Sequence, residues 1–347
     1  MRMAEAPPVY TTRAGDVDRD RDAVLSIWRG NLGDAEAMAA KYAWFYQDAP
    51  AGPPLLRLLG ADGADAGICT AGRRRMLLDG RPLQGGVLVD MAVVPAHRSL
   101  GPALMLLQGL KEGAARECAL LYGFPNPKAA PVFRRIGYRP AGDLVRYVRV
   151  LRHAPYFARR MPRAAAGCAG AAADLAGRVR DLLRAPATGG LRTAWLDAAD
   201  PRMQALWDAS TKPDGVAAVR DLAHLAWRFD RAPGGGFRYF AIGEADGSLD
   251  AWFAVRRRGD SLVVHDYWSV HGPAIGTRRI AALLRAARAR GHASVSVELA
   301  TSPGHLAPWL ASEFRERSRR PLFCHWSDTA HDAGAIPFHL TAADEDE

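Results

Sequence analysis

The sequence has little that would hold a metal or a disulfide framework. It contains only four cysteines in 347 residues: Cys69, Cys118, Cys168 and Cys324. None of them lies at the short spacing of a metal-ligand pair, so we expect no metal site and take each cysteine as a small buried or incidental residue. Scattered cysteines fit a reducing compartment, and the sequence therefore predicts a cytoplasmic protein.

Long apolar runs are also missing. No run of about twenty apolar residues exists, so we expect no membrane span. The first ten residues, MRMAEAPPVY, include no apolar stretch of signal-peptide length. The hydrophobic share is nevertheless 49%, which is ample for a buried core, and the length of 347 residues suggests two domains or one large one.

Lysine is scarce as well. The chain carries 46 basic residues and a net charge of +9, yet lysine occurs only as Lys41, Lys111, Lys128 and Lys212. The many arginines are spread along the chain and are not clustered with aromatic residues, so we expect no nucleic-acid partner. A positive field of this size would favour a small polyanionic ligand.

The most informative stretch runs from Val89 to Tyr138. The valine-rich segment 87–94 predicts a buried strand, which Pro95 ends because it removes a ladder donor. The turn Arg98–Gly101 then opens a helix, with Pro102 expected at its first position. Backbone N–H groups at such a turn favour an anion, and Arg98 adds charge. An ordinary strand-to-helix turn would give the same short pattern.

Two motifs in this stretch resemble those of the GCN5-related N-acetyltransferases (GNAT). Arg98-x-x-Gly101-x-Ala103 is similar to the family's acetyl-CoA loop. Tyr122-Gly123-Phe124 resembles its fifth strand. The segment 126–138, Asn-x-x-Ala-x-x-Val-Phe-x-Arg-x-Gly-Tyr, is similar to its second motif. The resemblance implies that residues 1–151 form a GNAT domain that binds acyl-CoA.

The second half repeats the element order of the first, after an Ala- and Arg-rich linker at 152–190 that includes a connector helix at 171–185. Residues 191–347 therefore resemble a second GNAT-like domain. Its corresponding turn, His271–Gly276, lacks a properly spaced Arg or Gln, and Pro273 removes a donor. We expect an α/β fold of the α+β type with two GNAT-like domains, each a mixed, mostly antiparallel sheet flanked by helices. The nearest whole-chain resemblance is to tandem-GNAT proteins with one degenerate domain.

The resemblance also implies roles for individual residues. The Arg98 side chain and the backbone of the loop would hold the pyrophosphate, a backbone N–H near Val93 would polarise the thioester, and Asn126 would contact the pantetheine arm or the turn. Phe133 stands where the family often carries a tyrosine that protonates the leaving thiolate. Tyr122 and Tyr138 are the nearest residues that could take this role. The expected cofactor-binding residues are Val93, Arg98, Ser99, Leu100, Gly101, Pro102, Ala103, Asn126 and Phe133.

Asp90 is the candidate general base, because it lies on the fourth strand where many family members carry an acidic residue. The alternative is a carboxylate that faces solvent or pairs with an arginine. His97 is expected to flank the phosphate site. In the second domain, strand alternation would place His265 and Tyr267 on one face, beside Asp266, from which they could reach an acceptor cleft. The aromatic cluster Tyr42, Trp44, Phe45 and Tyr46 would either line the acceptor pocket or pack in the core.

The expected function is acetyl transfer from acetyl-CoA to a primary amine of a small molecule or peptide. One alternative is transfer of another acyl or an aminoacyl group, as in the Fem-like transferases. A second is a catalytically silent acyl-CoA-binding protein, which Phe133 keeps open. The sequence indicates neither the acceptor nor the oligomeric state.

Overall fold

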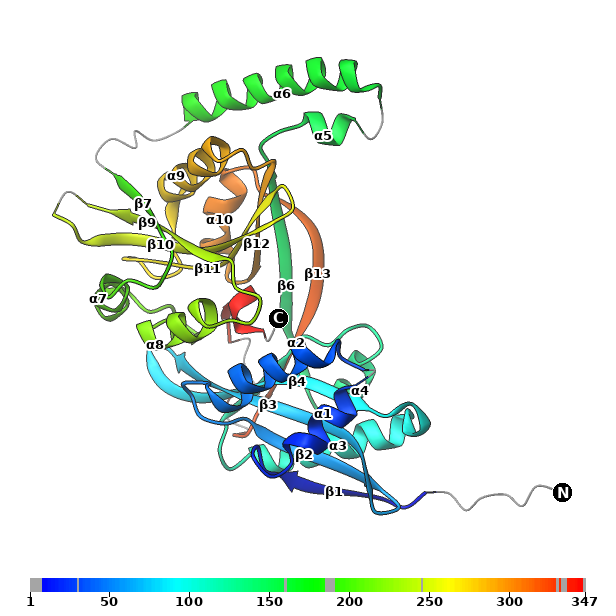
Figure 1. Cartoon of the computed structure of the whole chain (residues 1–347). Coiled ribbons are helices and arrows are strands. Elements are labelled where there is room, and N and C mark those ends of the chain that lie inside the picture. Colours follow the sequence, from blue (N-terminus) through cyan, green and yellow to red (C-terminus); the bar gives the residue numbers. More distant parts are fainter. Residues whose placement is uncertain are drawn as a thin grey trace. The chain divides into compact units, whose positions relative to one another are not determined.

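The computed structural model describes residues 8–29, 31–158, 161–184, 191–244, 246–328, 331 and 336–345. The chain divides into two compact units, each with hydrogen-bonded strands flanked by helices (Figure 1). Unit 1 comprises Met1–Gly142, Arg320–Ile336 and Asp344–Asp346, and unit 2 comprises Asp143–Arg319, Pro337–Ala343 and Glu347. None of the helices described is long and apolar enough to cross a membrane.

The strands of unit 1 follow the order β1-β2-β3-β4-β5-β13. All neighbours are antiparallel except β4 and β5, which run parallel from Gly85↔Leu120 to Val87↔Tyr122. A parallel pair needs a crossover, and helix α3 provides it. The strands are β1 (Tyr10–Gly15), β2 (Leu55–Ala61), β3 (Ala64–Leu78), β4 (Arg81–Val93), β5 (Leu120–Gly123) and β13 (Arg315–Trp326).

Helices cover both faces of this sheet because alternate residues of β3 point to opposite sides. Cys69 and Ala71 belong to the core cluster that contains Leu106 and Leu107 of α3, whereas Thr70 contacts Tyr46 of the N-terminal helices. Figure 1 shows α1 and α2 together on one side of the sheet. The helical elements are α1 (Arg21–Trp28), α2 (Ala35–Lys41), the π-helix η1 (Tyr42–Gln47), the 3-10 turn η2 (Pro95–His97), α3 (Leu100–Ala114) and α4 (Ala130–Arg135).

Unit 2 has the corresponding strand order, β7-β9-β10-β11-β12-β6, again with one parallel pair, β11 and β12. The short strand β14 pairs with β12 and with β8. The strands are β6 (Arg139–Val150), β7 (Arg192–Leu196), β8 (Val216–Ala218), β9 (Phe237–Gly243), β10 (Leu249–Arg258), β11 (Ser261–Ser269), β12 (Ser294–Ala300) and β14 (Phe338–Thr341).

The core of unit 2 lies between its sheet and helices α9 and α10, where Phe253, Tyr267, Leu283 and Trp309 are all fully buried. On the other face Trp268 packs on Trp207 of α7, with ring centroids 4.9 Å apart. The helical elements are α5 (Ala154–Phe157), α6 (Arg163–Arg184), α7 (Arg202–Ala209), α8 (Leu222–Leu225), the π-helix η3 (Ala226–Asp230), α9 (Gly276–Ala289), α10 (Pro303–Ala311) and the 3-10 turn η5 (Ala342–Asp344).

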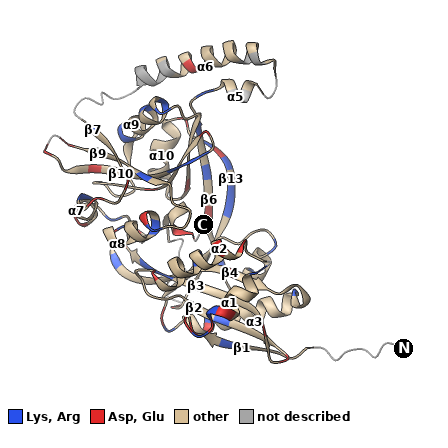
Figure 2. Cartoon of the chain, viewed as in Figure 1, with Lys and Arg blue, Asp and Glu red and all other residues tan. Residues whose placement is uncertain are grey.

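Basic residues occur on elements of both units. Figure 2 shows Lys and Arg on strands and helices of each unit, interspersed with Asp and Glu. The net charge of +9 is therefore not concentrated on a single helix or strand.

The last strand of each unit comes from the other half of the sequence. Residues Phe323–Trp326 of β13 pair with β5, and Val145–Val150 of β6 pair with β12. For this reason unit 1 includes Arg320–Ile336, whereas the sequence assigned all of 191–347 to one domain. The domain boundaries proposed from the sequence remain a prediction.

The expected fold class is confirmed, since both units combine a mixed, mostly antiparallel set of strands with flanking helices. One local expectation differs from the structure. The connector helix is longer than expected and spans Arg163–Arg184.

Candidate active site

The turn before α3 presents unoccupied backbone donors. Helix α3 begins at Leu100, after Ser99 in an extended N-cap conformation without a side-chain cap. The first four N–H groups of a helix have no intrahelical partner, and among the described residues Leu100 and Gly101 donate to no other group. A Cβ placed on Gly101 would meet nothing within 4 Å, so a ligand can approach the backbone closely.

Pro102 is the third residue of α3, although the sequence suggested the first. Its missing N–H still falls within the first turn, where no intrahelical acceptor exists, so the proline costs the helix no hydrogen bond. Its ring is buried, as is usual for a residue that packs the helix onto the sheet.

A pocket of about 480 Å³ opens beside this helix end. It is lined by Leu100 at the start of α3 and by Pro131, Arg134 and Arg135 of α4. Two guanidinium groups and the positive end of a helix together favour a polyanion such as a pyrophosphate. Arg135 belongs to one of the sequence motifs, but neither arginine was predicted as a site residue.

The Arg98 side chain turns away from this pocket. Its Nε donates to the Val93 carbonyl oxygen at 3.0 Å, and its Nη2 donates to the side-chain oxygen of Asn31. The sequence assigned this guanidinium to the pyrophosphate, but in the structure it joins the turn to the end of β4. The neighbouring His97 contacts Tyr10, whose hydroxyl lies 3.1 Å from Nδ1.

Asp90 lies in a β-bulge of β4. Ile68 pairs with Ala92 and Thr70 pairs with Val89, so Asp90 and Met91 together oppose the single residue Cys69. A bulge changes the direction of side chains and is common next to active sites. The φ angle of Asp90 is +53°, a left-handed conformation that Asp and Asn tolerate better than other non-glycine residues.

The bulge directs the Asp90 carboxylate toward the N-terminal helices. Lys41 Nζ lies 2.6 Å from its Oδ1, and the Tyr46 hydroxyl donates to its Oδ2 at 3.0 Å. The same hydroxyl is 2.9 Å from Thr70 Oγ1. The side chain of Asp90 is only 4% exposed and that of Lys41 is 28% exposed, so the ammonium group lies between solvent and carboxylate. The sequence suggested arginine as the alternative partner, whereas the partner is a lysine.

The aromatic cluster around this ion pair is part of the core. Tyr42, Trp44, Phe45 and Tyr46 are at most 6% exposed, and Tyr42 stacks on Tyr46 with centroids 4.6 Å apart. Burial raises the pKa of the Tyr42 phenol, which stays protonated and donates to the Val17 carbonyl oxygen at 2.5 Å.

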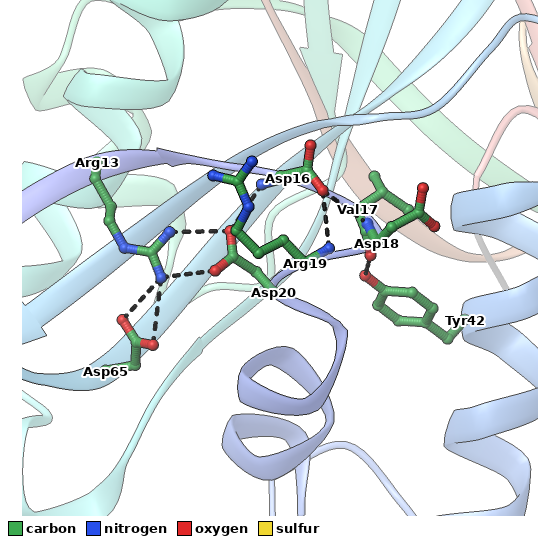
Figure 3. Close-up of polar contacts among 8 residues, drawn as sticks. All are labelled: Arg13, Asp16, Val17, Asp18, Arg19, Asp20, Tyr42 and Asp65. Atoms are coloured by element: carbon green, nitrogen blue, oxygen red, sulfur yellow. Dashed lines mark hydrogen bonds and ion pairs between the residues drawn. The ribbon is translucent and has the colours of Figure 1, made fainter.

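The loop that contains Val17, whose carbonyl oxygen accepts the Tyr42 hydrogen bond, is held in place by an ion pair (Figure 3). Arg13 donates to both oxygens of Asp20 at 2.9 and 2.8 Å, and Asp20 also accepts the Asp16 amide. The hydrogen bond from Arg13 holds the pKa of Asp20 below its ordinary value. The loop before α1 therefore anchors the π-helix η1, which carries Tyr46.

The two tyrosines proposed as acids are sequestered. The Tyr138 hydroxyl is buried and has no hydrogen-bond partner among the residues that the structure describes, and burial raises the pKa of this phenol well above its ordinary value. The Tyr122 hydroxyl is also buried and donates to the Asp344 carbonyl oxygen at 2.9 Å. Phe133 packs on Tyr138 and Phe323 in the same core. Neither hydroxyl is exposed to solvent or to the pocket at α3.

Asn126 shapes the loop before α4. Its side-chain oxygen accepts the amides of Lys128 and Ala129, both at 3.0 Å. This arrangement orients the first turn of the helix that carries Arg134 and Arg135. The expected contact of Asn126 with a pantetheine arm remains a prediction.

In the equivalent turn of unit 2, the amides of His271, Gly272, Ala274 and Ile275 donate within the turn, and Pro273 has no N–H. The turn of unit 1 is bonded in a similar way, through the amides of His97, Arg98 and Ser99. Nearby, the Arg279 guanidinium donates to both oxygens of Asp250 and to the Ile275 carbonyl oxygen. That unit 2 lacks a coenzyme A loop remains a prediction from its sequence.

The expectation that His265 and Tyr267 share a face is wrong. A bulge on β11 pairs Val264 with Val255 and Asp266 with Ala254, so His265 has no opposite residue. Tyr267 therefore joins Val264 in the core, while His265 packs on Phe237 on the other face. Burial lowers the pKa of His265 to about 3.

Asp266 is buried with Arg220, at 3.1 Å, and accepts a hydrogen bond from Thr341. Its surroundings are those of a core ion pair. In the described part of the chain, no three His, Cys, Asp or Glu side chains come together in a way that could hold a metal ion.

Lys41 was not predicted as a site residue, since no motif covers it. The only available signal is that Lys41 is one of four lysines and directly precedes the aromatic cluster. Its contact with Asp90 depends on the bulge, which the alternating pattern of β4 does not reveal.

Solved structures of acetyltransferases share this fold. A GCN5-related N-acetyltransferase from Anabaena variabilis matches with a TM-score of 0.63 at 12% identity, over 94% of this chain and 75% of that one. A probable N-acyltransferase from Enterococcus faecalis matches with a TM-score of 0.64 at 11% identity, over 92% and 73%.

A tandem GNAT protein from the clavulanic acid biosynthesis pathway matches with a TM-score of 0.51 at 15% identity, over 92% of this chain and 99% of that one. No protein-family model and no curated protein sequence matches the chain. At these identities the likeness establishes the GNAT fold, in a tandem arrangement, and nothing finer.

Proposed function

From a fold shared with GCN5-related N-acetyltransferases, we propose that this chain transfers an acetyl group from acetyl-CoA to a primary amine, and that unit 1 does so. The observation that carries the proposal is the open helix end at Leu100 and Gly101 beside Arg134 and Arg135. Open amides, a helix dipole and two guanidinium groups match the charge and the donor needs of a pyrophosphate. Acetyl-CoA supplies the activated acyl thioester.

Different residues of unit 1 would bind the phosphates, polarise the thioester and accept the proton of the amine. Leu100 and Gly101 amides, with the arginines of α4, bind phosphate, and Arg98 holds the turn against the end of β4. The backbone near Val93 would polarise the thioester carbonyl. Asp90 would accept a proton from the incoming amine, and Tyr46 fixes the direction of its carboxylate.

No tyrosine is assigned to the leaving group. Tyr122 and Tyr138 are buried, and a thiol has an ordinary pKa of about 8.5, so the thiolate of coenzyme A can leave and take up a proton from solvent. Phe133 at the position of the family's frequent tyrosine therefore does not exclude catalysis.

Transfer of another acyl group from coenzyme A is a second candidate, since the features above recognise the phosphates and not the acyl chain. An aminoacyl donor bound to RNA is less well supported, because the Arg98–Ala103 turn resembles a coenzyme A loop. A silent acyl-CoA-binding protein would share the loop but would not need the Asp90 network.

Titration calorimetry with acetyl-CoA tests the proposal. We expect one site per chain, because the turn of unit 2 lacks a properly spaced arginine or glutamine and has Pro273 in place of a residue with an N–H. Gly101→Glu should abolish binding, since the added carboxylate occupies the open space and repels phosphate.

Gly304→Glu is the matched control. Gly304 is also the second residue of a helix, α10, and a Cβ placed on it would likewise meet nothing within 4 Å. Both glutamates favour their helix N-termini, so both variants should fold. Binding that survives in folded Gly101→Glu, or a stoichiometry near two, contradicts the proposed site.

A further inference from the structure

The π-helix before the candidate base occurs twice in the chain. The segments 42–50, YAWFYQDAP, and 225–233, LAWRFDRAP, align without a gap, and they contain η1 and η3. The amides of Asp48 and Arg231 donate to the carbonyl oxygens of Ala43 and Ala226, each at 3.0 Å. The two π-helices are therefore the same backbone structure in the two units.

The β-bulge that follows the π-helix in sequence also occurs in both units, on β4 in unit 1 and on β11 in unit 2. The side chains at the positions of Lys41, Tyr46 and Asp90, however, differ between the two units. At the aligned positions Lys41 corresponds to His224 and Tyr46 to Phe229, and the bulge on β11 carries His265 in place of Asp90. Unit 2 forms the π-helix and the bulge without these groups, so the fold does not require them.

Asp90 and Trp28 lie against the Lys41 ammonium. Asp90 Oδ1 lies 2.6 Å from Nζ and the ring of Trp28 lies 5.9 Å from it, while the Tyr46 hydroxyl donates to the other carboxylate oxygen of Asp90. A carboxylate and an aromatic face are the groups that recognise an alkylammonium ion. Lys41 thus places a primary amine directly against the candidate base.

We propose that Lys41 is an acetylation site of this protein, modified by its own unit 1. The inference rests on the proposed function, because acetyl-CoA must bind at α3 and Asp90 must act as the base. Asp90 lies on the strand that leads through Val93 to the phosphate turn, so base, amine and thioester belong to one site.

The chemistry is that of ordinary amide formation. The Lys41 ammonium gives one proton to the Asp90 carboxylate, and the neutral Nζ attacks the thioester carbonyl carbon. The N–C bond forms, the C–S bond breaks, and coenzyme A leaves as the thiolate. The second proton leaves the nitrogen and ends on the thiol, and Asp90 returns its proton to solvent. The product, an uncharged acetyl-lysine, no longer neutralises Asp90.

Because the chain has only four lysines, the acetylation of each one can be measured separately. The full-length protein, freed of acetyl groups, is incubated with isotopically labelled acetyl-CoA, and the labelling rates of Lys41, Lys111, Lys128 and Lys212 are measured by peptide mass spectrometry. Lys128 is the most exposed of the four and reports uncatalysed acetylation. We expect Lys41 to be labelled at least about tenfold faster than Lys128, although Lys41 is ion-paired and only partly exposed.

Two variants separate catalysis from reactivity. Asp90→Asn should reduce Lys41 labelling to the Lys128 rate, whereas Lys128→Arg should leave Lys41 labelling unchanged. Calorimetry on the same samples reports acetyl-CoA binding. If acetyl-CoA binds but Lys41 is labelled no faster than Lys128, the acetylation of Lys41 is overturned and the proposed function is not. If acetyl-CoA does not bind, the proposed function and the inference both fall.

Discussion

Arg98 Nε donates to the carbonyl oxygen of Val93 at 3.0 Å, across the turn that joins β4 to α3. This bond connects the strand end at which a thioester would be polarised to the helix end at which phosphate would bind. The guanidinium also donates through Nη2 to Asn31, so two of its five N–H donors are held within the protein. Arg98 is therefore a positioning residue of the turn, and its charge acts on a phosphate only at a distance.

This arrangement predicts that Arg98→Lys and Arg98→Met weaken acetyl-CoA binding to a similar extent. A lysine keeps the charge but cannot reach both acceptors with a planar fork. We expect each variant to raise the Kd by about tenfold, or about 1.4 kcal/mol, in calorimetry. Wild-type affinity in Arg98→Lys together with a loss in Arg98→Met would show that the charge contacts phosphate directly.

Asp90→Asn should lower turnover by about a hundredfold or more, the usual cost of losing a general base. Asparagine has the same shape and tolerates the φ of +53°, so the bulge should persist. Acetyl-CoA affinity should stay unchanged because the phosphate turn is untouched. Coenzyme A release is measured over a panel of amines and a range of pH, and full activity throughout would exclude Asp90 as the base.

Tyr138→Phe should retain activity and lose no stability. Within the described part of the chain the buried Tyr138 hydroxyl has no hydrogen-bond partner, and removing an unsatisfied polar group costs no hydrogen bond. Tyr122→Phe is the matched control, because its hydroxyl does have an acceptor, and we expect it to cost about 1 kcal/mol of unfolding free energy. A hundredfold fall in turnover for Tyr138→Phe at unchanged stability would instead identify the leaving-group acid.

Asp20→Asn should destabilise unit 1 in a pH-dependent way. Arg13 lowers the pKa of Asp20 in the folded state, so the carboxylate stabilises the fold above its unfolded pKa of about 3.9, and this stability is lost as the pH falls below that value. Because Arg13 is half exposed, we expect only about 1 kcal/mol at pH 7. Denaturant unfolding of wild type and variant should differ at pH 7 and converge near pH 2; an equal difference at both would contradict the ion pair.

Much of the fold was predictable because its signals are local. The valine-rich run before Pro95, the turn at Arg98–Gly101 and the apolar spacing that follows predicted a strand, a turn and a helix, and these are β4, η2 with its turn, and α3. Backbone propensity and the burial of one face decide such elements within a few residues.

The partners of side chains were not predictable in the same way. Alternation along β11 predicted a common face for His265 and Tyr267, but a bulge of one residue reverses the direction of one of them. The bulge at Asp90 brings its carboxylate to Lys41, and the sequence pattern of β4 has no feature that marks it. Arg98 matched a motif, yet its contacts depend on Val93 and on Asn31, which follows α1 in the chain.

The sequence by itself determined most of the order of strands and helices and the position of the turn before α3. That this turn binds phosphate, and that the second half lacks such a loop, stay predictions. Only the tertiary structure decided that β13 completes the strands of unit 1 and β6 those of unit 2, and that Lys41 neutralises Asp90. The physical reason is the distance along the chain over which each signal acts. The periodic spacing of hydrophobic residues and the residue preferences of turns act between near neighbours in the sequence. Strand pairing and ion pairs join residues far apart in sequence, which only the packed core brings together.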